Sequence, residues 1–205
     1  MQFEDTNSFS EGLACVKIGE KFGFIDKTGK VVIEPTYSLP SVFSEGLASV
    51  TVGGKASLSY GAYYIEDTGR PFFIDKSGKV AIKFEKDVIG AKAFSEGLAA
   101  IEVRKDPDNT LTGFIDKTGK FVIQPKHNDV DSFSDGLAQF YLDGDWAYMN
   151  KKGEIVFSTK FDLADDFEKG LAWVQQGGLS GFENFRDAKY GYIDKTGKVI
   201  WQPTK

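Results

Sequence analysis

Two short phrases decide the fold of this chain: Phe9-Ser10-Glu11-Gly12-Leu13-Ala14 and, shortly after it, Gly23-Phe24-Ile25-Asp26-Lys27-Thr28-Gly29-Lys30. The first phrase returns at residues 43–48, 94–99, 133–138 and 167–172, and the second at 73–79, 113–120, 148–153 and 191–198. Five copies in 205 residues average about 41 residues each, a length that suits one four-stranded propeller blade per copy. The pattern predicts a tandem array of five similar units.

The composition favours a folded β-sheet protein. Hydrophobic residues make up 41% of the chain and aromatic residues 14%, with 18 Phe and 23 Gly. Aromatic and β-branched residues between glycine-marked turns are typical of strands. The net charge is −5, and the lysines are spread through the repeated turns. Because nucleic-acid binders carry a concentrated basic patch, we expect neither nucleic acid nor an anionic membrane as a partner.

The residues that could carry chemistry are few. Cys15 is the only cysteine and His127 the only histidine, so an internal disulfide and a multi-cysteine metal site are excluded. No phosphate loop, zinc spacing or dinucleotide fingerprint is present. We therefore expect no catalytic residue, no cofactor, no metal and no enzyme activity. No apolar run reaches transmembrane length, and the polar, acidic N-terminus shows no signal peptide, which favours the cytoplasm.

The residue pattern of each unit predicts four antiparallel strands joined by tight turns. Residues 13–18, 22–26 and 31–33 are short apolar segments with β-branched and aromatic side chains, and a shorter piece leads to Phe43. Asp26-Lys27-Thr28-Gly29 has the chemistry of a turn, because Asp bonds to the backbone ahead of it and Gly takes a positive φ. No repeated phrase shows a sustained helical period.

The fold class predicted is all-β, with five repeats in one domain over residues 1–205. The repeats are bounded approximately at 1–35, 36–85, 86–125, 126–160 and 161–205. The chain ends part-way through a unit and begins about where that unit would resume, so strands from both termini could close a β-propeller-like ring. An open β-solenoid or β-hairpin array is the alternative.

Small and aromatic side chains are expected to pack the units together. The pairs Ala14/Val16, Ala48/Val50, Ala99/Ile101, Ala138/Phe140 and Ala172/Val174 each share one strand face, since side chains alternate with a period of two. The aromatic residues of the phrases are predicted to fill the space between sheets: Phe9, Phe24, Phe43, Phe94, Phe114, Phe133, Phe167 and Tyr192.

These phrases resemble the bacterial WG-repeat (KWG) family, whose unit reads approximately FSEGLAxVxxxxKWGFIDKTGKVVIPPxYD. The resemblance covers essentially the whole chain in five copies. The sequence departs from the family at the Trp-Gly dipeptide, which is replaced by Phe22-Gly23, Pro71-Phe72, Thr112-Gly113, Trp146-Ala147 and Tyr190-Gly191. The resemblance implies a repeat scaffold with binding-type roles, and it supplies no catalytic residues.

The recurring carboxylates are interpreted as parts of turns. Calcium needs six to eight converging oxygens, whereas Asp26, Asp75, Asp116 and Asp194 occur once per repeat. Glu11, Glu45, Glu96 and Asp135 recur in the same way, so a glycosidase-like carboxylate pair is not expected. The local clusters Asp162, Asp165, Asp166 and Asp143, Asp145 are interpreted as solvated loop acids. Cys15 is expected to be a small packed strand residue.

Three insertions supply the predicted binding surface. They lie at roughly residues 53–71, 104–112 and 176–190, always before the second phrase of a unit. The first carries Tyr60, Tyr63, Tyr64 and Arg70, and the third carries Phe182, Phe185, Arg186 and Tyr190. Loops rich in Tyr, Phe and Arg are typical of binding surfaces. We therefore predict a non-enzymatic scaffold that binds an unknown protein partner through the insert-bearing face, without membrane insertion.

Two other functions stay open. The first is a carbohydrate or cell-envelope binder, in which exposed aromatic rings would stack on sugars. The three tryptophans, Trp146, Trp173 and Trp201, all lie in or beside predicted strands, which counts against it. The second is an enzyme with a site at the centre of a closed ring, which would need polar groups converging on the axis.

Overall fold

The computed structural model describes residues 5–54, 56–59, 62–65, 69–84, 87–177 and 188–204, which form strands, turns and loops. Within these ranges there is no helix, and hence no helix that could cross a membrane. The first sheet has the strand order β1-β2-β3-β4 and comprises β1 (Asp5–Thr6), β2 (Leu13–Ile18), β3 (Lys21–Asp26) and β4 (Val31–Tyr37). Its strands pair antiparallel throughout.

The remaining sheets repeat this plan, except that the fourth has three strands among the described residues where the sequence predicted four. The second has the order β10-β9-β6-β5 and comprises β5 (Phe43–Ser44), β6 (Leu47–Val52), β9 (Arg70–Asp75) and β10 (Val80–Lys83). The third contains β11 (Val88–Ala91), β12 (Ala99–Asp106), β13 (Asn109–Ile115) and β14 (Phe121–His127). The fourth contains β15 (Leu137–Leu142), β16 (Asp145–Asn150) and β17 (Ile155–Thr159). The fifth contains β18 (Leu163–Ala164), β19 (Leu171–Gln176), β20 (Lys189–Asp194) and β21 (Val199–Thr204).

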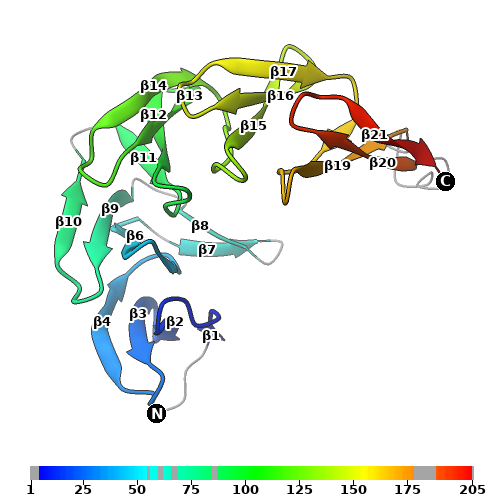
Figure 1. Ribbon diagram of the computed structural model, residues 1–205. Coiled ribbons are helices and arrows are strands. Elements are labelled where there is room, and N and C mark those ends of the chain that lie inside the picture. The colour runs from blue at the N-terminus through cyan, green and yellow to red at the C-terminus, as the bar shows by residue number, and fades with distance from the viewer. Residues whose placement is uncertain are drawn as a thin grey trace.

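The five sheets follow one another along an open arc, with the N-terminus at one end and the C-terminus at the other (Figure 1). β1 pairs with β2 and β21 pairs with β20, so each terminal strand belongs to its own sheet. The all-β prediction is confirmed. Among the described residues no sheet contains strands from both termini, so the predicted ring closure is not observed, and the arrangement is compatible with the open array.

The first phrase forms a two-residue hairpin turn. Ser10 and Leu13 exchange backbone hydrogen bonds of 2.9 and 3.0 Å, and between them Glu11 and Gly12 have φ values of 51° and 91°. Positive φ at both central residues defines the turn that matches the twist of paired strands. The same left-handed pair recurs at Glu45, Glu96, Asp135 and Lys169, each followed by Gly.

The second phrase closes the hairpin between β3 and β4. The Asp26 Oδ1 atom accepts hydrogen bonds from Thr28 N at 2.8 Å, Thr28 Oγ1 at 2.6 Å and Lys30 N at 3.1 Å. These bonds, the one from the Thr28 hydroxyl above all, hold the pKa of Asp26 below its ordinary value. Asp75, Asp116 and Asp194 repeat the arrangement, and Asn150 does so with its amide oxygen. The interpretation of these residues as turn formers is confirmed.

Most of the core lies between successive sheets, and a smaller cluster of Ala14, Val16 and Ile25 lies on the first sheet alone. The alternating alanine and apolar positions, from Ala14 and Val16 to Ala172 and Val174, are all at most 2% exposed. The phrase aromatics Phe24, Phe43, Phe94, Phe114, Phe133 and Phe167 are at most 1% exposed. The prediction that Phe9 fills the space between sheets is wrong, because this residue is 48% exposed. Its sheet has no preceding sheet among the described residues that would cover it.

Candidate functional site

Every junction between neighbouring sheets contains the same aromatic contact. A ring on β3 or its equivalent is covered by the first-phrase Phe of the next sheet. The ring centroids lie 4.9 Å apart for Phe24 and Phe43, 4.9 Å for Phe73 and Phe94, 4.7 Å for Phe114 and Phe133, and 5.0 Å for Tyr148 and Phe167. Each sheet therefore presents an aromatic ring on the face that looks toward the next sheet, which we call its forward face.

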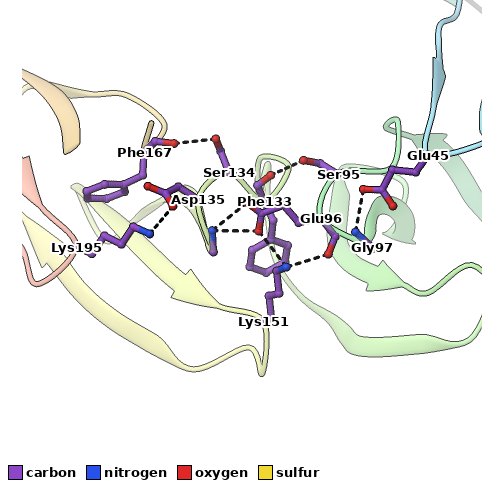
Figure 2. Close-up of polar contacts among 11 residues, drawn as sticks. Glu45, Ser95, Glu96, Gly97, Phe133, Ser134, Asp135, Lys151, Phe167 and Lys195 are labelled. Carbon is purple, nitrogen blue, oxygen red and sulfur yellow. Dashed lines mark hydrogen bonds and ion pairs between the residues drawn. The ribbon is translucent and has the colours of Figure 1, made fainter. Parts of the chain in front are cut away.

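A hydroxyl group links the same sheets at the turn. The first-phrase Ser of each sheet donates its hydroxyl hydrogen to the main-chain carbonyl of the next sheet's Phe (Figure 2). The four bonds are Ser10 to Phe43 at 2.5 Å, Ser44 to Phe94 at 2.6 Å, Ser95 to Phe133 at 2.6 Å and Ser134 to Phe167 at 2.8 Å. This hydrogen bond thus fixes the position of the next sheet's Phe relative to the turn of the sheet before it.

An acidic residue completes the link, and we call the hydroxyl and acid contacts together the corner clasp. Glu96 accepts a hydrogen bond from Gly136 N at 3.0 Å and pairs with Lys151 at 3.0 Å (Figure 2). The equivalent sets are Glu11 with Gly46 and Lys76, Glu45 with Gly97 and Lys117, and Asp135 with Gly170 and Lys195. The Lys76 ammonium is the main cause of the lowered pKa of Glu11, and Lys195 has the same effect on Asp135. The recurrent acids are therefore structural.

The forward face of the last sheet is the exception to this pattern. It carries two ring pairs: Trp173 and Tyr190, with centroids 5.5 Å apart, and Tyr192 and Trp201, 6.1 Å apart with an angle of 7° between planes. Tyr192 pairs with Trp201 across the strands as Tyr148 pairs with Phe157 in the fourth sheet. Trp201 is 57% exposed and Tyr190 38%. We call these four residues the terminal aromatic face.

The turn beside this face also departs from the repeat. Glu168 and Lys169 stand where the other repeats have Ser and an acid. Their side chains are 80% and 89% exposed and form a local ion pair at 3.0 Å. A carboxylate cannot donate to a carbonyl as Ser does at neutral pH, and a lysine cannot accept the Gly N–H bond. The last sheet therefore lacks both polar elements of the corner clasp on its forward side.

The structure shows only part of the insert-bearing surface predicted from sequence. Tyr60, Phe182, Phe185 and Arg186 lie outside the described residues. Tyr63 and Tyr64 lie in β8 (Ala62–Ile65), which pairs with β7 (Ala56–Ser59) as a separate hairpin that points into the space within the arc in Figure 1. Arg70 begins β9 and is exposed, whereas Tyr190 lies in the fifth sheet.

Trp201 is exposed, contrary to the expectation from its place in a predicted strand. Trp201 lies in a strand as expected, but strand position did not bury it, because no described sheet covers its face. Sequence reasoning thus missed the terminal aromatic face. The signal was the aromatic content of the fifth repeat, which has Trp173 and Trp201 where the first has Cys15 and Ile33.

The remaining candidate residues are placed as packed side chains. Cys15 is 3% exposed, and its sulfur accepts a 3.5 Å hydrogen bond from Ser41 N. The His127 ring lies 4.6 Å from that of Phe140, and burial lowers its pKa, with a smaller effect from Lys126. Cys15 and His127 lie in the first and third sheets, so they form no dyad. In the ranges that the structure describes, no group of three or more His, Cys, Asp or Glu residues could hold a metal.

Comparison with solved structures shows similarity in fold. A protein of unknown function from Bacteroides caccae is 15% identical, with a TM-score of 0.46, and the match covers 98% of this chain and 81% of that one. The extracellular domain of the putative hybrid two component system BT3049 from B. thetaiotaomicron is 12% identical, with a TM-score of 0.51. That match covers 99% of this chain but 28% of the other, so this chain spans little more than a quarter of its length.

Comparison with protein families identifies the repeat. No curated protein matches the chain. The family model of the WG containing repeat matches residues 1–22, 22–55, 72–105, 113–146, 146–179 and 190–204, which together make up most of the chain. These matches agree with the recurring phrases and with the resemblance seen in the sequence. The chain belongs to the family of proteins built from the WG containing repeat.

Proposed function

We propose that this protein is a non-enzymatic repeat scaffold that binds a protein partner through the terminal aromatic face. One observation carries the proposal. Tyr148 and Phe157 on the fourth sheet are covered by Phe167, whereas the matching pair on the fifth sheet, Tyr192 and Trp201, has no such cover among the described residues. Exposed contiguous aromatic surface of this kind is typical of interaction sites.

The junctions inside the array indicate what such a partner would present. Phe167 lies with its ring 5.0 Å from Tyr148 and 6.2 Å from Phe157. An apolar or aromatic side chain of the partner would make the same contact with Tyr192 and Trp201. Tyr and Trp bury a large area and lose little conformational entropy, which is why they dominate binding energies at protein interfaces.

The insertions extend the same proposal. Arg70 is exposed at the start of β9, and the β7–β8 hairpin carries Tyr63 and Tyr64. Aromatic and arginine side chains on such segments suit a protein contact. We propose the insert-bearing face as a second part of the binding surface.

The test uses the wild-type chain as bait and a double variant, Y190A/W201A, as the comparison. Both side chains are well exposed, so the variant should keep its thermal stability. Tyr141 is 59% exposed on the fourth sheet, and Y141A is the matched control. We expect a captured partner, once purified, to bind Y190A/W201A at least about thirtyfold more weakly, as the loss of 2 kcal/mol implies. Unchanged affinity would overturn the proposal.

A carbohydrate ligand is the second candidate, and a specific observation favours it. The Tyr192 and Trp201 rings are parallel within 7°, and Trp201 is exposed. Aromatic faces of this kind can stack on sugar rings. If this function holds, a soluble glycan or peptidoglycan fragment should change the tryptophan fluorescence of the wild type and of Y141A but not bind W201A. If the wild type binds no glycan on an array and no peptidoglycan, a carbohydrate ligand is excluded.

A further inference from the structure

We propose that the opposite end of the array is a separate interaction surface, and that its corner binds the Ser-acid-Gly turn of a repeat sheet from another protein, where the acid is Glu or Asp. The proposal does not rest on the terminal aromatic face of this chain binding a partner. It follows from two observations. The first sheet carries the same contact groups as the other four sheets, and no described residue contacts these groups in the way that the preceding sheet does at the other junctions.

Each inner sheet offers four groups to the sheet before it. These are the first-phrase Phe ring, its carbonyl oxygen, the Gly N–H of the hairpin turn and the lysine of the second phrase, as in Phe133, Gly136 and Lys151. The first sheet has all of these groups at Phe9, Gly12 and Lys27. Phe9 is 48% exposed, and Gly12 and Lys27 are exposed.

No residue in the described ranges makes the corner clasp with this end. Lys27 forms no ion pair there, whereas Lys76, Lys117, Lys151 and Lys195 each pair with an acid of the preceding sheet. The first sheet therefore displays an ammonium group, an N–H donor and a carbonyl acceptor in the places where the other sheets are bound. A Ser hydroxyl and a carboxylate are the groups that complement them.

The second-phrase glycine gives independent support. A Cβ built on Gly78, Gly119, Gly153 or Gly197 would lie 2.7–3.3 Å from a side chain of the preceding sheet: Ile33, Ile82, Ile123 or Phe157. A Cβ on Gly29 would meet nothing within 4 Å. Among the residues that the structure describes, nothing therefore fills the corner of the first sheet at the position where the other four sheets are in tight contact.

A second copy of this chain does not fit the corner. Its last sheet would bring Glu168 and Lys169 to the place of Ser and the acid. Lys169 would face Lys27, and no hydroxyl would reach the Phe9 carbonyl. Like charges at an interface and unpaired polar groups reject a wrong partner. The repeat sheet that fits therefore carries Ser and an acid in this turn.

The contact is confined to the corner. Ala14 and Val16, on the side of the first sheet that corresponds to the other junctions, are already 2% and 0% exposed. The surface available to a partner is therefore the exposed Phe9 ring with the polar groups of Gly12 and Lys27. Because the ion pair would be partly exposed, its binding should weaken as the salt concentration rises.

The chain itself supplies a partner for the test. The variant K27Q/E168S/K169E restores the Ser-acid pair at the last sheet and removes its own Lys27, so it cannot use the same ion pair to join itself. The substituted side chains are exposed, those at 168 and 169 by 80% and 89%, so the fold should be retained, which circular dichroism would check. This variant is immobilised, and wild type is passed over it. The matched surface carries K27Q alone, which keeps Glu168 and Lys169.

We expect wild type to bind the K27Q/E168S/K169E surface about tenfold tighter than the K27Q surface. As analytes, K27Q and F9A should each lose that preference. In the mixture, a zero-length carbodiimide should join Lys27 of wild type to position 169 of the triple variant, which mass spectrometry locates. Equal binding to the two surfaces, or no such cross-link, would overturn the proposal. Either result leaves the proposed function intact, because that function concerns the native terminal aromatic face and an outside partner.

Discussion

The junction between the fourth and fifth sheets and the open face of the fifth sheet are built from matching strands but have opposite environments. In the junction, Phe167 covers Tyr148, which is 1% exposed. On the open face, Tyr192 and Trp201 hold the matching positions, and Trp201 is 57% exposed. The same contrast separates Phe167, 1% exposed, from Phe9, 48% exposed. A residue's place within the repeat therefore does not decide whether it is core or surface.

For the aromatic residues of the repeated phrases, what decides it is the presence of a neighbouring sheet. In a repeat array each unit contacts only its neighbours, so stability is close to a sum of unit terms and nearest-neighbour terms. The four junctions supply the neighbour terms here, through one aromatic contact and one corner clasp each. The two ends hold the corresponding positions without a neighbouring sheet among the described residues, and this makes each end an internal comparison for the junctions.

The largest expected effect is the loss of a junction aromatic. We expect F167A to lower the free energy of unfolding by about 3–5 kcal/mol, because it leaves a cavity over Tyr148 and Phe157. F9A removes the same ring at an exposed site and should change stability by less than about 0.5 kcal/mol. Urea denaturation followed by far-ultraviolet circular dichroism measures both. Similar losses from the two variants would mean that Phe9 is packed as tightly as Phe167.

A smaller effect should separate two glycines with the same backbone. Gly197 and Gly29 have φ values of 81° and 83°, so alanine at either position costs about 1–2 kcal/mol for the left-handed conformation. At Gly197 the added Cβ would also lie 2.7 Å from the Phe157 ring, whereas at Gly29 it meets open space. G197A should therefore lose about 1–3 kcal/mol more than G29A in the same denaturation measurement. Equal losses would show that the ring moves aside without cost.

Much of the fold follows from local chemistry that the sequence states directly. Asp26 and Gly29 predict their turn because the hydrogen bonds that close it run to Thr28 and Lys30, two and four residues away. The alternation of Ala14 and Val16 predicts their common burial because strands have a period of two. These inferences concern neighbours in the chain, and the structure confirms them in every copy.

The candidate surfaces could not be predicted because they depend on how sheets stack. The hydrogen bond from Lys76 Nζ to the Glu11 carbonyl spans 65 residues, and its only sequence signal is that Ser, acid and lysine recur together. The exposure of Phe9 has no local signal, since buried Phe residues hold the same position in the other repeats, and the exposure of Trp201 is signalled only by the aromatic content of the fifth repeat. The break at Glu168 and Lys169 is visible in the sequence, but its meaning requires the clasp that those residues interrupt.

The smallest effect in this comparison concerns the lysines, Lys76 in a junction and Lys27 at the end. Lys76 Nζ lies 3.1 Å from the Glu11 carboxylate, and their side chains are 47% and 29% exposed. We expect K76M to cost about 0.5 kcal/mol, as partly exposed ion pairs usually do. K27M removes a lysine that has no such pair in the described part of the chain, so its cost should be near zero. Denaturation at low salt measures both, and a cost that persists at high salt would indicate lost packing instead.

The pH dependence of that difference identifies its cause. Lys76 lowers the pKa of Glu11 below its ordinary 4.5, so the folded state favours the ionised carboxylate. Stability from a lowered carboxyl pKa is present above the unfolded value and is lost as the pH falls through the folded value. The gap between K76M and wild type should therefore be constant near neutral pH, shrink below about 4.5 and vanish once Glu11 is protonated. The stability of K27M should equal that of wild type over the whole pH range. If the stability difference between K76M and wild type persists after Glu11 is protonated, Lys76 acts through its contact with the Glu11 carbonyl and not through the carboxylate.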